Sequence, residues 1–208
     1  MECMVRISSK IKVLIMALML LSVVGLGQVE TVDSYSETNW SNNDLALYSG
    51  SNLYCGQSFS SEKRFKLTSC VFYLGKDAGT TGNITASIYQ HTGTYGTNSV
   101  PTGAALETST NTIDASTLPS GSRSLFTFTF SGSITLAANT YYCIVVRRDN
   151  TGSVSQRVIV GRAGSSPAHG GNAFQSADGS SWTENAARDC CFYVYGIKEK
   201  NAFLWTNF

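Results

Sequence analysis

The sequence predicts an all-β fold, an antiparallel β-sandwich preceded by an N-terminal hydrophobic helix. Apolar and polar residues alternate with a period of two in many short segments, as they do in half-buried strands. Clusters of Gly, Asn, Asp, Ser and Thr separate these segments, and such clusters are typical of turns. Beyond the N-terminus, no long window has the apolar spacing that an amphipathic helix needs.

Residues 1–27 have the pattern of an export signal. Three basic residues precede an uninterrupted apolar run over 13–27 that ends in Gly-Leu-Gly. This run is shorter than the ~20 residues that a helix needs to cross the hydrocarbon core of a membrane, and its small final residues suit a signal peptidase. We therefore expect a signal peptide over 1–27 and a secreted or extracellular surface location. The alternative is a retained membrane anchor, which would be the protein's contact with a membrane.

The segment 28–197 carries the strands of the predicted sandwich. The strand candidates, in chain order, are 54–59, 65–74, 83–90, 124–130, 141–148, 155–161 and 190–196, with weaker ones at 104–108 and 133–136. Ile84, Ala86 and Ile88 fall on one face of their strand, and three phenylalanines between 126 and 130 alternate with threonines. About eight short strands with turns between them and no helix build a two-sheet antiparallel sandwich.

The composition fits a single domain that does not bind nucleic acid. The 208 residues are enough for one domain of ordinary size. Charged residues make up 14% of the chain, against about 25% in a typical soluble domain. Hydroxyl and amide groups therefore supply many of the polar groups that interact with water. The formal net charge of +1 and the lack of a basic block argue against binding by phosphate neutralisation.

Five cysteines follow the export signal: Cys55, Cys70, Cys143, Cys190 and Cys191. An odd number does not form a closed set of disulfides, and no C-x-x-C or histidine spacing indicates zinc. Cys70, Cys143 and Cys191 lie in apolar runs, where Cys is most often a small buried hydrophobe. A disulfide between adjacent strands is the alternative for an exported chain. Since successive strand residues point to opposite faces, at most one of Cys190 and Cys191 faces the core.

A series of short motifs carries a resemblance to a known family. In chain order these are GQSF, LTSCVFYLGK, TGNITASIY, TGTYGT, VPTGAAL, DASTLP, FTFSG, TYYCIVV, VGRAGSSPAHGGN, DGSSW and CFYVYG. The chain over 31–197 resembles exported surface modules of environmental bacteria, archaea and phage-like genomes, which are similar to jelly-roll carbohydrate-binding modules and choice-of-anchor-type domains. The resemblance implies a jelly-roll-like sandwich and favours a core-filling role for Cys70 and Cys190.

The resemblance also implies a structural calcium ion, because jelly-roll binding modules often carry one. Calcium takes oxygen ligands from loops, and the loop or strand-edge candidates are Asp33, Asp149, Asp178 and Asp189. No D-x-D-x-D-G run is present, so a site would be assembled from distant segments. The alternative is that these carboxylates cap turns.

The sequence does not predict an enzyme. A serine hydrolase of the α/β type would carry a G-x-S-x-G motif, which is absent. His91 and His169, the two histidines of the chain, lie in or beside glycine-rich loops, where we expect them to bond neighbouring backbone. Acidic residues are scattered singly, without the paired carboxylates of a glycosidase.

Sugar recognition instead needs exposed aromatic rings beside polar groups, and the loops offer both. The predicted ligand-binding residues are Tyr95, Arg162, Asn172, Gln175, Asp178 and Trp182, with Trp40 as a further aromatic candidate. The alternative for Trp182 is a plug that closes the sandwich. We therefore expect a non-catalytic module for surface binding or adhesion, whose partner is a glycan or cell-surface polymer.

The C-terminal segment 198–208 lies beyond the predicted sandwich. It ends in large apolar residues, Phe203, Leu204, Trp205 and Phe208, which would be costly to expose. Packing back on the sandwich or self-association would cover them. Self-association favours the alternative function, a structural subunit of a virion, an extracellular filament or a cell-surface layer.

Overall fold

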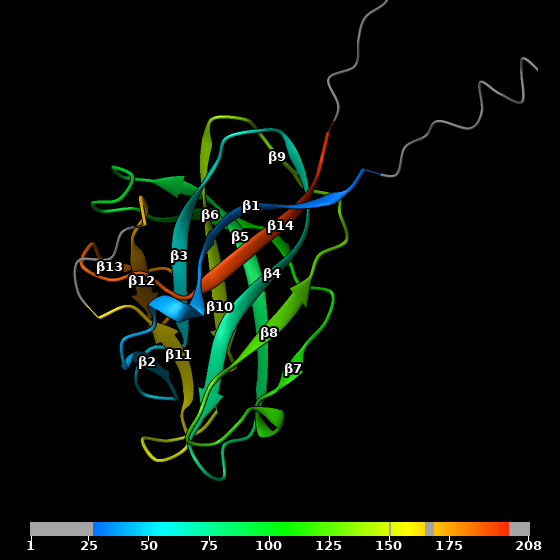
Figure 1. Ribbon diagram of the computed structural model, residues 1–208. Coiled ribbons are helices and arrows are strands. Elements are labelled where there is room, and N and C mark those ends of the chain that lie inside the picture. Colours follow the sequence, from blue (N-terminus) through cyan, green and yellow to red (C-terminus); the bar gives the residue numbers. More distant parts are fainter. Residues whose placement is uncertain (1–26, 150, 165–168, 200–208) are drawn as a thin grey trace, which may run out of the picture.

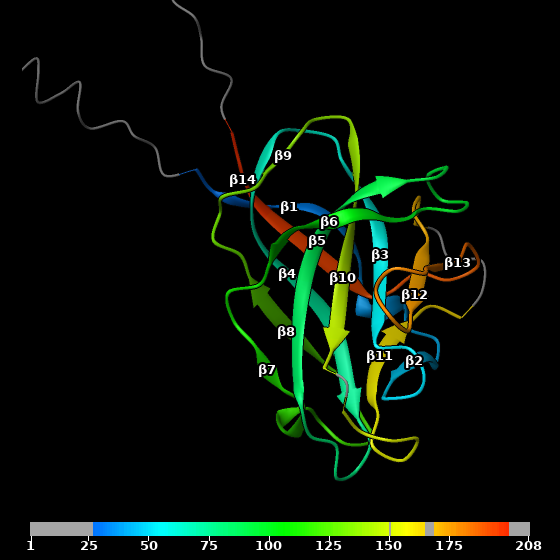
Figure 2. The same cartoon turned by 180° about the vertical axis from the view of Figure 1, so that it is seen from behind.

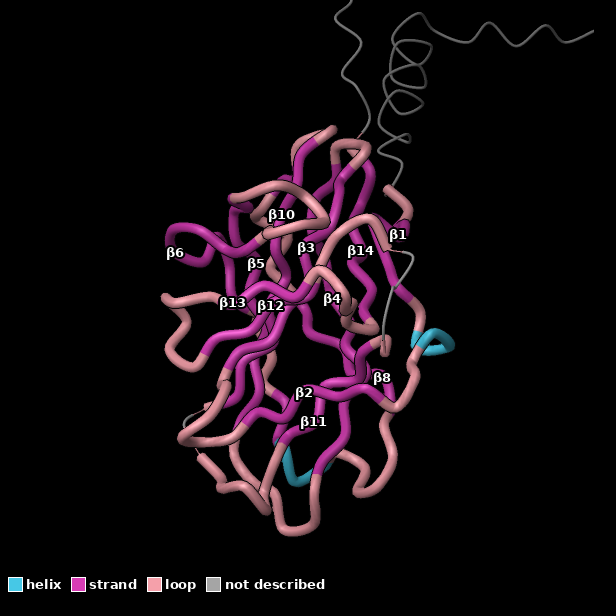
Figure 3. The backbone as a smooth tube through the Cα atoms, turned by 90° about the vertical axis from the view of Figure 1, so that its left-hand side faces the viewer, coloured by secondary structure: helices cyan, strands magenta, loops and turns pink. Residues whose placement is uncertain are grey.

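Two antiparallel sheets form the protein, which confirms the all-β prediction. The computed structural model describes residues 27–149, 151–164 and 169–199. The two sheets face each other in the manner of a β-sandwich, as the view from the side shows (Figure 3). The predicted N-terminal helix and the four apolar residues Phe203, Leu204, Trp205 and Phe208 lie outside the described residues.

The first sheet has the strand order β1-β14-β4-β11-β2, and β8 and β9 also pair with β4. Its strands β1, β14, β4 and β8 lie toward the viewer in Figure 1. Its strands are β1 (Val29–Tyr35), β2 (Asn43–Leu47), β4 (Phe65–Lys76), β8 (Ser124–Thr129), β9 (Thr135–Leu136), β11 (Val158–Arg162) and β14 (Phe192–Lys198). The long strand β4 is the spine of this sheet because four other strands pair with it.

The second sheet has the order β13-β12-β3-β10-β5-β6, and β7 also pairs with β5. It faces the viewer when the molecule is seen from behind (Figure 2). Its strands are β3 (Tyr54–Ser61), β5 (Asn83–Thr92), β6 (Val100–Thr108), β7 (Ile113–Asp114), β10 (Thr140–Arg148), β12 (Ala173–Ser176) and β13 (Thr183–Asn185). Its central strand β10 pairs with β3 and β5 along nearly its whole length.

Two short 3-10 helices, η1 (Glu37–Asn39) and η2 (Ala115–Thr117), connect strands. Each is capped by a side-chain oxygen, since Ser36 Oγ accepts from Thr38 N at 3.2 Å and Asp114 Oδ1 accepts from Ser116 N at 2.8 Å. Neither of these described helices has the length or apolar character needed to span a membrane.

The core lies between the sheets and follows the period-two pattern of the strands. On β10, Tyr142, Ile144 and Val146 point into the core, whereas Tyr141 and Arg147 lie on the outer face and are exposed. This alternation is the pattern that the sequence analysis used, because one face of each strand is buried against the other sheet.

A β-bulge explains why the alternation fails in β4. Leu67 points into the core, and so do Cys70 and Phe72, although an unbroken strand would place Leu67 and Cys70 on opposite faces. The pairing with β14 shifts between Tyr195 and Gly196, which leaves Thr68 as an extra residue. The bulge therefore lets both halves of β4 bury their apolar residues.

The sequence analysis missed β1, β2, β7, β12 and β13 and placed the start of β14 too early. The missed strands are short or carry few apolar residues, so the period-two pattern is weak in them. β14 begins at Phe192, while Cys190 forms only an isolated bridge with Arg162. These segments extend because neighbouring strands supply hydrogen-bond partners for their backbone.

Candidate functional site

The structure brings Tyr95 and Trp182 to the outer face of the second sheet. Tyr95 stacks on Tyr141 with ring centroids 4.1 Å apart and an angle of 12° between the rings. Tyr141 is 44% exposed, and His91 lies beside both rings. Burial raises the pKa of Tyr95 well above its ordinary value of 10.0, so this phenol stays neutral at physiological pH.

Trp182 packs on the same outer face, nearer the middle of the sheet. Its ring makes edge contacts with Tyr54, Tyr89 and Phe174, at centroid distances of 5.9, 6.2 and 5.4 Å. The indole is half-buried and belongs to a small apolar cluster around Cys143 and Val145. Trp182 therefore covers the sheet surface, whereas the alternative prediction was a plug that closes the sandwich.

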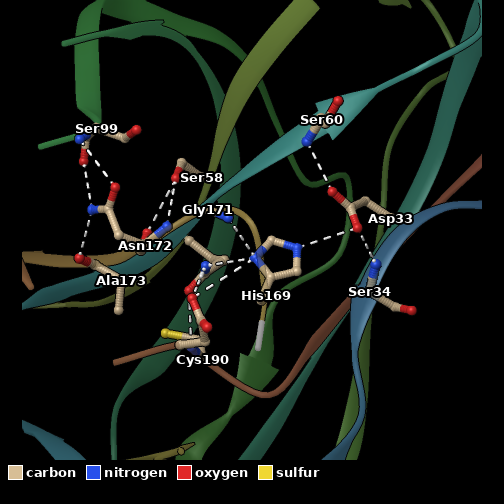
Figure 4. Close-up of polar contacts among 12 residues, drawn as sticks. Asp33, Ser34, Ser58, Ser60, Ser99, His169, Gly171, Asn172, Ala173 and Cys190 are labelled. Carbon is tan, nitrogen blue, oxygen red and sulfur yellow. Dashed lines mark hydrogen bonds and ion pairs between the residues drawn. The ribbon is translucent and has the colours of Figure 1, made fainter. Parts of the chain in front are cut away.

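Two of the predicted ligand-binding side chains serve the fold instead. Arg162 on β11 is 7% exposed and donates from Nη2 to the backbone oxygen of Asp44 at 3.2 Å. Asn172 is fully buried; its Nδ2 donates to Ser99 O and Ala173 O, both at 3.0 Å. Neither side chain presents free polar atoms to a ligand at the surface, and Asn172 acts as a clamp between two loops (Figure 4).

The other two predicted polar contacts, Gln175 and Asp178, lie near the β12–β13 turn. Gln175 is half-buried in register with Cys55. Asp178 is exposed, and its Oδ1 accepts from the backbone of Ser180 and Ser181 at 2.8 Å each. The N–H groups of Ser181 and Ser180 lower the pKa of Asp178 to about 2. The carboxylate therefore holds the turn.

His169 lies at the centre of a polar hub, which we define as the side chains of Asp33, Gln57, His169 and Asp189. Figure 4 shows the contact between His169 and Asp33. Its Nδ1 accepts from the backbone N–H of Gly171 at 3.0 Å, as we expected for a loop histidine. Nδ1 therefore carries no proton, so Nε2 carries it and donates to Asp33 Oδ1 at 3.2 Å. These contacts fix the orientation of the imidazole ring.

The polar hub connects the two sheets. Asp33 on β1 also accepts from Ser60 N on β3 at 2.8 Å. Gln57 on β3 donates to Asp189 Oδ1 at 2.5 Å and accepts from Cys190 N at 2.9 Å. Each of these bonds joins a strand of the second sheet to a segment of the first sheet or to the segment preceding β14. The hub therefore fixes the spacing of the sheets at this end of the core.

The four predicted calcium ligands lie in three different places. Asp33 and Asp189 belong to the polar hub, and Asp178 holds its turn. Asp149 accepts from Asn83 N at 2.8 Å at the start of β5. Within 27–149, 151–164 and 169–199, no three His, Cys, Asp or Glu side chains form a group suited to a metal ion. Calcium binding stays a prediction, and the structure does not assemble these four carboxylates into one site.

A polar hollow on the outer face of the first sheet is the site that the sequence analysis did not predict. We call it the ion-pair hollow. It has a volume of about 350 Å³ and is lined by Asp44, Ala46, Lys76, Asp77, Ala78, Ser120, Gly121, Ser122, Arg123, Arg157 and Ile159.

Trp40, one of the predicted aromatic candidates, adjoins one side of the ion-pair hollow. Asp44 Oδ1 accepts from Trp40 Nε1 at 3.1 Å and from Arg123 Nε at 3.0 Å. A second bond from Arg123 Nη2 to Asp44 Oδ2 completes a two-point ion pair. The guanidinium carbon of Arg123 also lies 4.9 Å from the centre of the Trp40 ring. Carboxylate, guanidinium and indole therefore hold one another in place.

A second ion pair forms another side of the ion-pair hollow. Arg157 donates to Asp77 from Nε at 2.5 Å and from Nη2 at 3.3 Å. The hydrogen bond from Arg157 lowers the pKa of Asp77 below its ordinary value of 3.8. Asp77 is therefore ionised at physiological pH and cannot act as a proton donor there.

The floor and one wall of the ion-pair hollow depend on small residues. Ala46 and Ile159 are paired across β2 and β11 and form the floor. The loop that precedes β8 passes directly over Gly75 of β4, where an added Cβ would lie 2.2 Å from Ser122 O. Only glycine admits this close approach, so Gly75 positions the wall that carries Arg123.

The side chains that line the ion-pair hollow offer hydrogen-bond donors and acceptors close together. Both arginines use Nε and Nη2 for their carboxylates, so among the described residues their Nη1 atoms have no hydrogen-bond partner. Lys76 adds a third cation, and its Nζ donates to Ser116 O at 2.7 Å. Fixed donors next to fixed acceptors suit vicinal hydroxyls, each of which donates and accepts.

Comparisons with known proteins add no relative to this picture. The chain matches no protein-family model, and no curated protein shows significant similarity to it. The resemblance to exported surface modules therefore stays a prediction from the motifs, and the geometry of the ion-pair hollow is the basis for a functional assignment.

Proposed function

We propose that this protein is an exported, non-catalytic surface-binding module, and that the ion-pair hollow holds a glycan-like ligand of a cell surface or polymer. The observation that carries the proposal is the lining of the hollow by two Asp–Arg pairs beside Trp40. In this proposal the sandwich is jelly-roll-like, and residues 1–27 direct the chain out of the cell.

The charge balance of the ion-pair hollow supports this ligand class. Three cations and two carboxylates line it, so the hollow tolerates both neutral sugars and sugars with one acidic group. Guanidinium and carboxylate groups form directional hydrogen bonds with pairs of hydroxyls. The side chains are already held by their ion pairs and by Trp40, so little ordering is required when a ligand binds.

A non-catalytic role is supported by the state of the polar side chains. The pKa of Asp77 is lowered, so this carboxylate is not poised to donate a proton. Asp44 Oδ1 accepts hydrogen bonds from two partners, Trp40 and Arg123, which fix its position. The polar hub contains a histidine between two carboxylates, but both ring nitrogens bond to groups of the protein itself. The hub thus has a sufficient structural explanation.

Arg123→Gln should weaken retention on immobilised glycans at least about tenfold, because a hydrogen bond to a charged group contributes about 1.5–3 kcal/mol. Ala46→Phe should have a similar effect, since the ring would fill the ion-pair hollow without removing any charge. The measurement is binding to a panel of neutral and uronate-containing oligosaccharides, followed by titration calorimetry with the best member.

Arg147→Gln is the matched control, because Arg147 is exposed on the outer face of the opposite sheet. It should bind like the unmodified protein. Tyr95→Ala tests the aromatic candidates of the second sheet in the same assay. Retention that survives both hollow variants but fails in Tyr95→Ala would overturn the choice of site, and a chain that retains no oligosaccharide of the panel would contradict the ligand class.

A further inference from the structure

Two thiols from different sheets meet in the core. The Sγ atoms of Cys55 and Cys190 are 3.4 Å apart, and both residues are fully buried. Cys55 lies on β3 of the second sheet, while Cys190 lies just before β14 of the first sheet. A disulfide has an S–S distance of about 2.05 Å, so an approach of little more than an ångström would join them.

The surroundings of the pair favour this approach. The backbone N–H of Cys190 is held by Gln57 Oε1 at 2.9 Å, and Gln57 is two residues from Cys55 on the same strand face. Cys190 is also in bridge register with Arg162 on β11. The polar hub therefore holds the two backbone segments next to each other independently of the sulfur atoms.

Arg162 supplies a positive charge at the pair. It is 7% exposed, and its Nε is buried without a hydrogen-bond partner among the described residues. The hydrogen bond with Cys55 and burial raise the pKa of the Cys190 thiol, and the charge of Arg162 acts in the opposite direction. Burial acts to raise the pKa of the Cys55 thiol, but the hydrogen bond with Cys190 and the charge of Arg162 outweigh it and lower this pKa. Both thiols are fully buried in the closed sandwich, so an oxidant reaches them only during folding, when solvent is still in contact with them.

We propose that Cys55 and Cys190 form an inter-sheet disulfide when the chain folds in the presence of a small-molecule or enzyme disulfide. One thiolate attacks the oxidant's disulfide and releases a thiolate, which gives a mixed disulfide. The second thiolate then attacks the mixed disulfide and releases the other thiol of the oxidant. The protein loses two electrons and two protons, and the oxidant's disulfide is reduced to two thiols.

This pairing also accounts for the odd number of cysteines that follow the predicted export signal. Cys70 lies in the core, and Cys143 lies under the outer cluster of the second sheet, both buried. Burial raises the pKa of both thiols far above their ordinary value of 9.0, and that of Cys191 to about 12. Among the described cysteines, the structure shows one contact between sulfur atoms, so three cysteines remain as buried thiols.

The test is cysteine mapping of the full chain after refolding from denaturant in a glutathione redox buffer. The product is denatured, alkylated without reductant and digested. Cys55 and Cys190 should escape alkylation, and the linked product should be lighter than the reduced one by about 2 Da, the mass of two hydrogen atoms. Cys191→Ser and Cys143→Ser should keep the link, whereas Cys190→Ser should leave Cys55 alkylated.

Alkylation of both Cys55 and Cys190 after oxidative refolding would overturn the proposal, and so would a link from Cys55 to Cys191. The proposal relies on export only for the source of the oxidant, so the same mapping on protein recovered from its native cells separates the two ideas. If the refolded protein contains the disulfide but the protein from its native cells has free thiols, export would be contradicted. The assignment of the disulfide to Cys55 and Cys190 would still hold.

Discussion

Replacing Arg148 with Met is expected to lower the free energy of unfolding by about 2–4 kcal/mol. Arg148 is on the inward face of β10 and is fully buried. Its Nη1 donates to Leu47 O at 2.9 Å and to Gln156 O at 2.6 Å, and its Nη2 donates to Thr81 O at 2.7 Å. Met has a similar length but no donor, so three carbonyls would lose their partner.

The structure around Arg148 explains why water would not fully replace the guanidinium. The three carbonyls come from three different segments at one end of the sandwich: the last residue of β2, the β4–β5 connection and the β10–β11 connection. Gly152 passes so close that a Cβ there would lie 2.5 Å from Arg148 Nη2, and its φ is +80°. Arg148 therefore holds these three segments together at this end of the sandwich, and its loss should loosen all of them.

Arg147→Met is the control because Arg147 directly precedes Arg148 on the same strand but lies on the exposed face. It should change the free energy of unfolding by no more than about 0.5–1 kcal/mol. The measurement is urea denaturation of both variants beside the unmodified protein. Equal losses in the two variants would contradict the role assigned to Arg148.

Asp189 should make the protein less stable by about 2 kcal/mol as the pH rises from about 4 to about 6. Burial raises the pKa of Asp189 from 3.8 to about 6, and the residue is fully buried. Its Oδ1 accepts from Gln57, while its Oδ2 is buried without a partner among the described residues. Its neighbours have smaller effects on the pKa: the hydrogen bond from Gln57 and the interactions with His169 lower it, and the charge of Asp33 raises it.

The direction follows from proton binding. Below pH 3.8 the carboxyl group is protonated in both the folded and the unfolded chain. Between 3.8 and about 6 the unfolded chain releases the proton while the folded chain keeps it, so unfolding becomes more favourable with rising pH. Above this range both states are ionised and the difference stays constant.

Asp189→Asn isolates this effect because Asn keeps an acceptor for Gln57 and does not titrate. The difference in free energy of unfolding between the variant and the unmodified protein should change in favour of the variant by about 2 kcal/mol between pH 4 and pH 7. Urea denaturation at a series of pH values measures it. A difference that does not depend on pH would refute the raised pKa.

Asp178→Asn is the control of opposite sign. The pKa of Asp178 is lowered from 3.8 to about 2, so its contribution is present above 3.8 and is lost as the pH falls toward 2. This substitution should therefore give no pH-dependent difference between pH 5 and pH 7. Comparing the two variants therefore separates the effect of burying a carboxyl group on the pH dependence of stability from the effect of a carboxyl group that caps a turn.

The period-two pattern predicted most of the fold because it is a local property. Ile84 and Ile88 or Tyr142 and Ile144 reveal a buried face without any knowledge of the partner strand. The pattern failed where burial depends on the neighbours. β1 and β13 extend because β14 and β12 bind their backbone, and β4 contains a bulge that no alternation rule anticipates.

The sequence predicted only part of the candidate site. Aromatic residues in loops singled out Trp40, Tyr95 and Trp182, and the structure places all three on outer faces of the sheets. The polar partners were predicted less well, since Asn172 and Arg162 turned inward. The sequence around a polar side chain in a glycine-rich loop looks the same whether that side chain is exposed to solvent or is buried in hydrogen bonds with a neighbouring loop.

The sequence by itself determined that this chain is an all-β protein, because most of the longer strands show a buried face in their own alternation of apolar and polar residues. Only the tertiary structure decided which side chains meet. The ion-pair partners Asp44 and Arg123 are 79 positions apart, Asp77 and Arg157 are 80 apart, and Cys55 and Cys190 are 135 apart. Strand order and register set these contacts, and both arise from burying all the strand faces together, which no local pattern encodes.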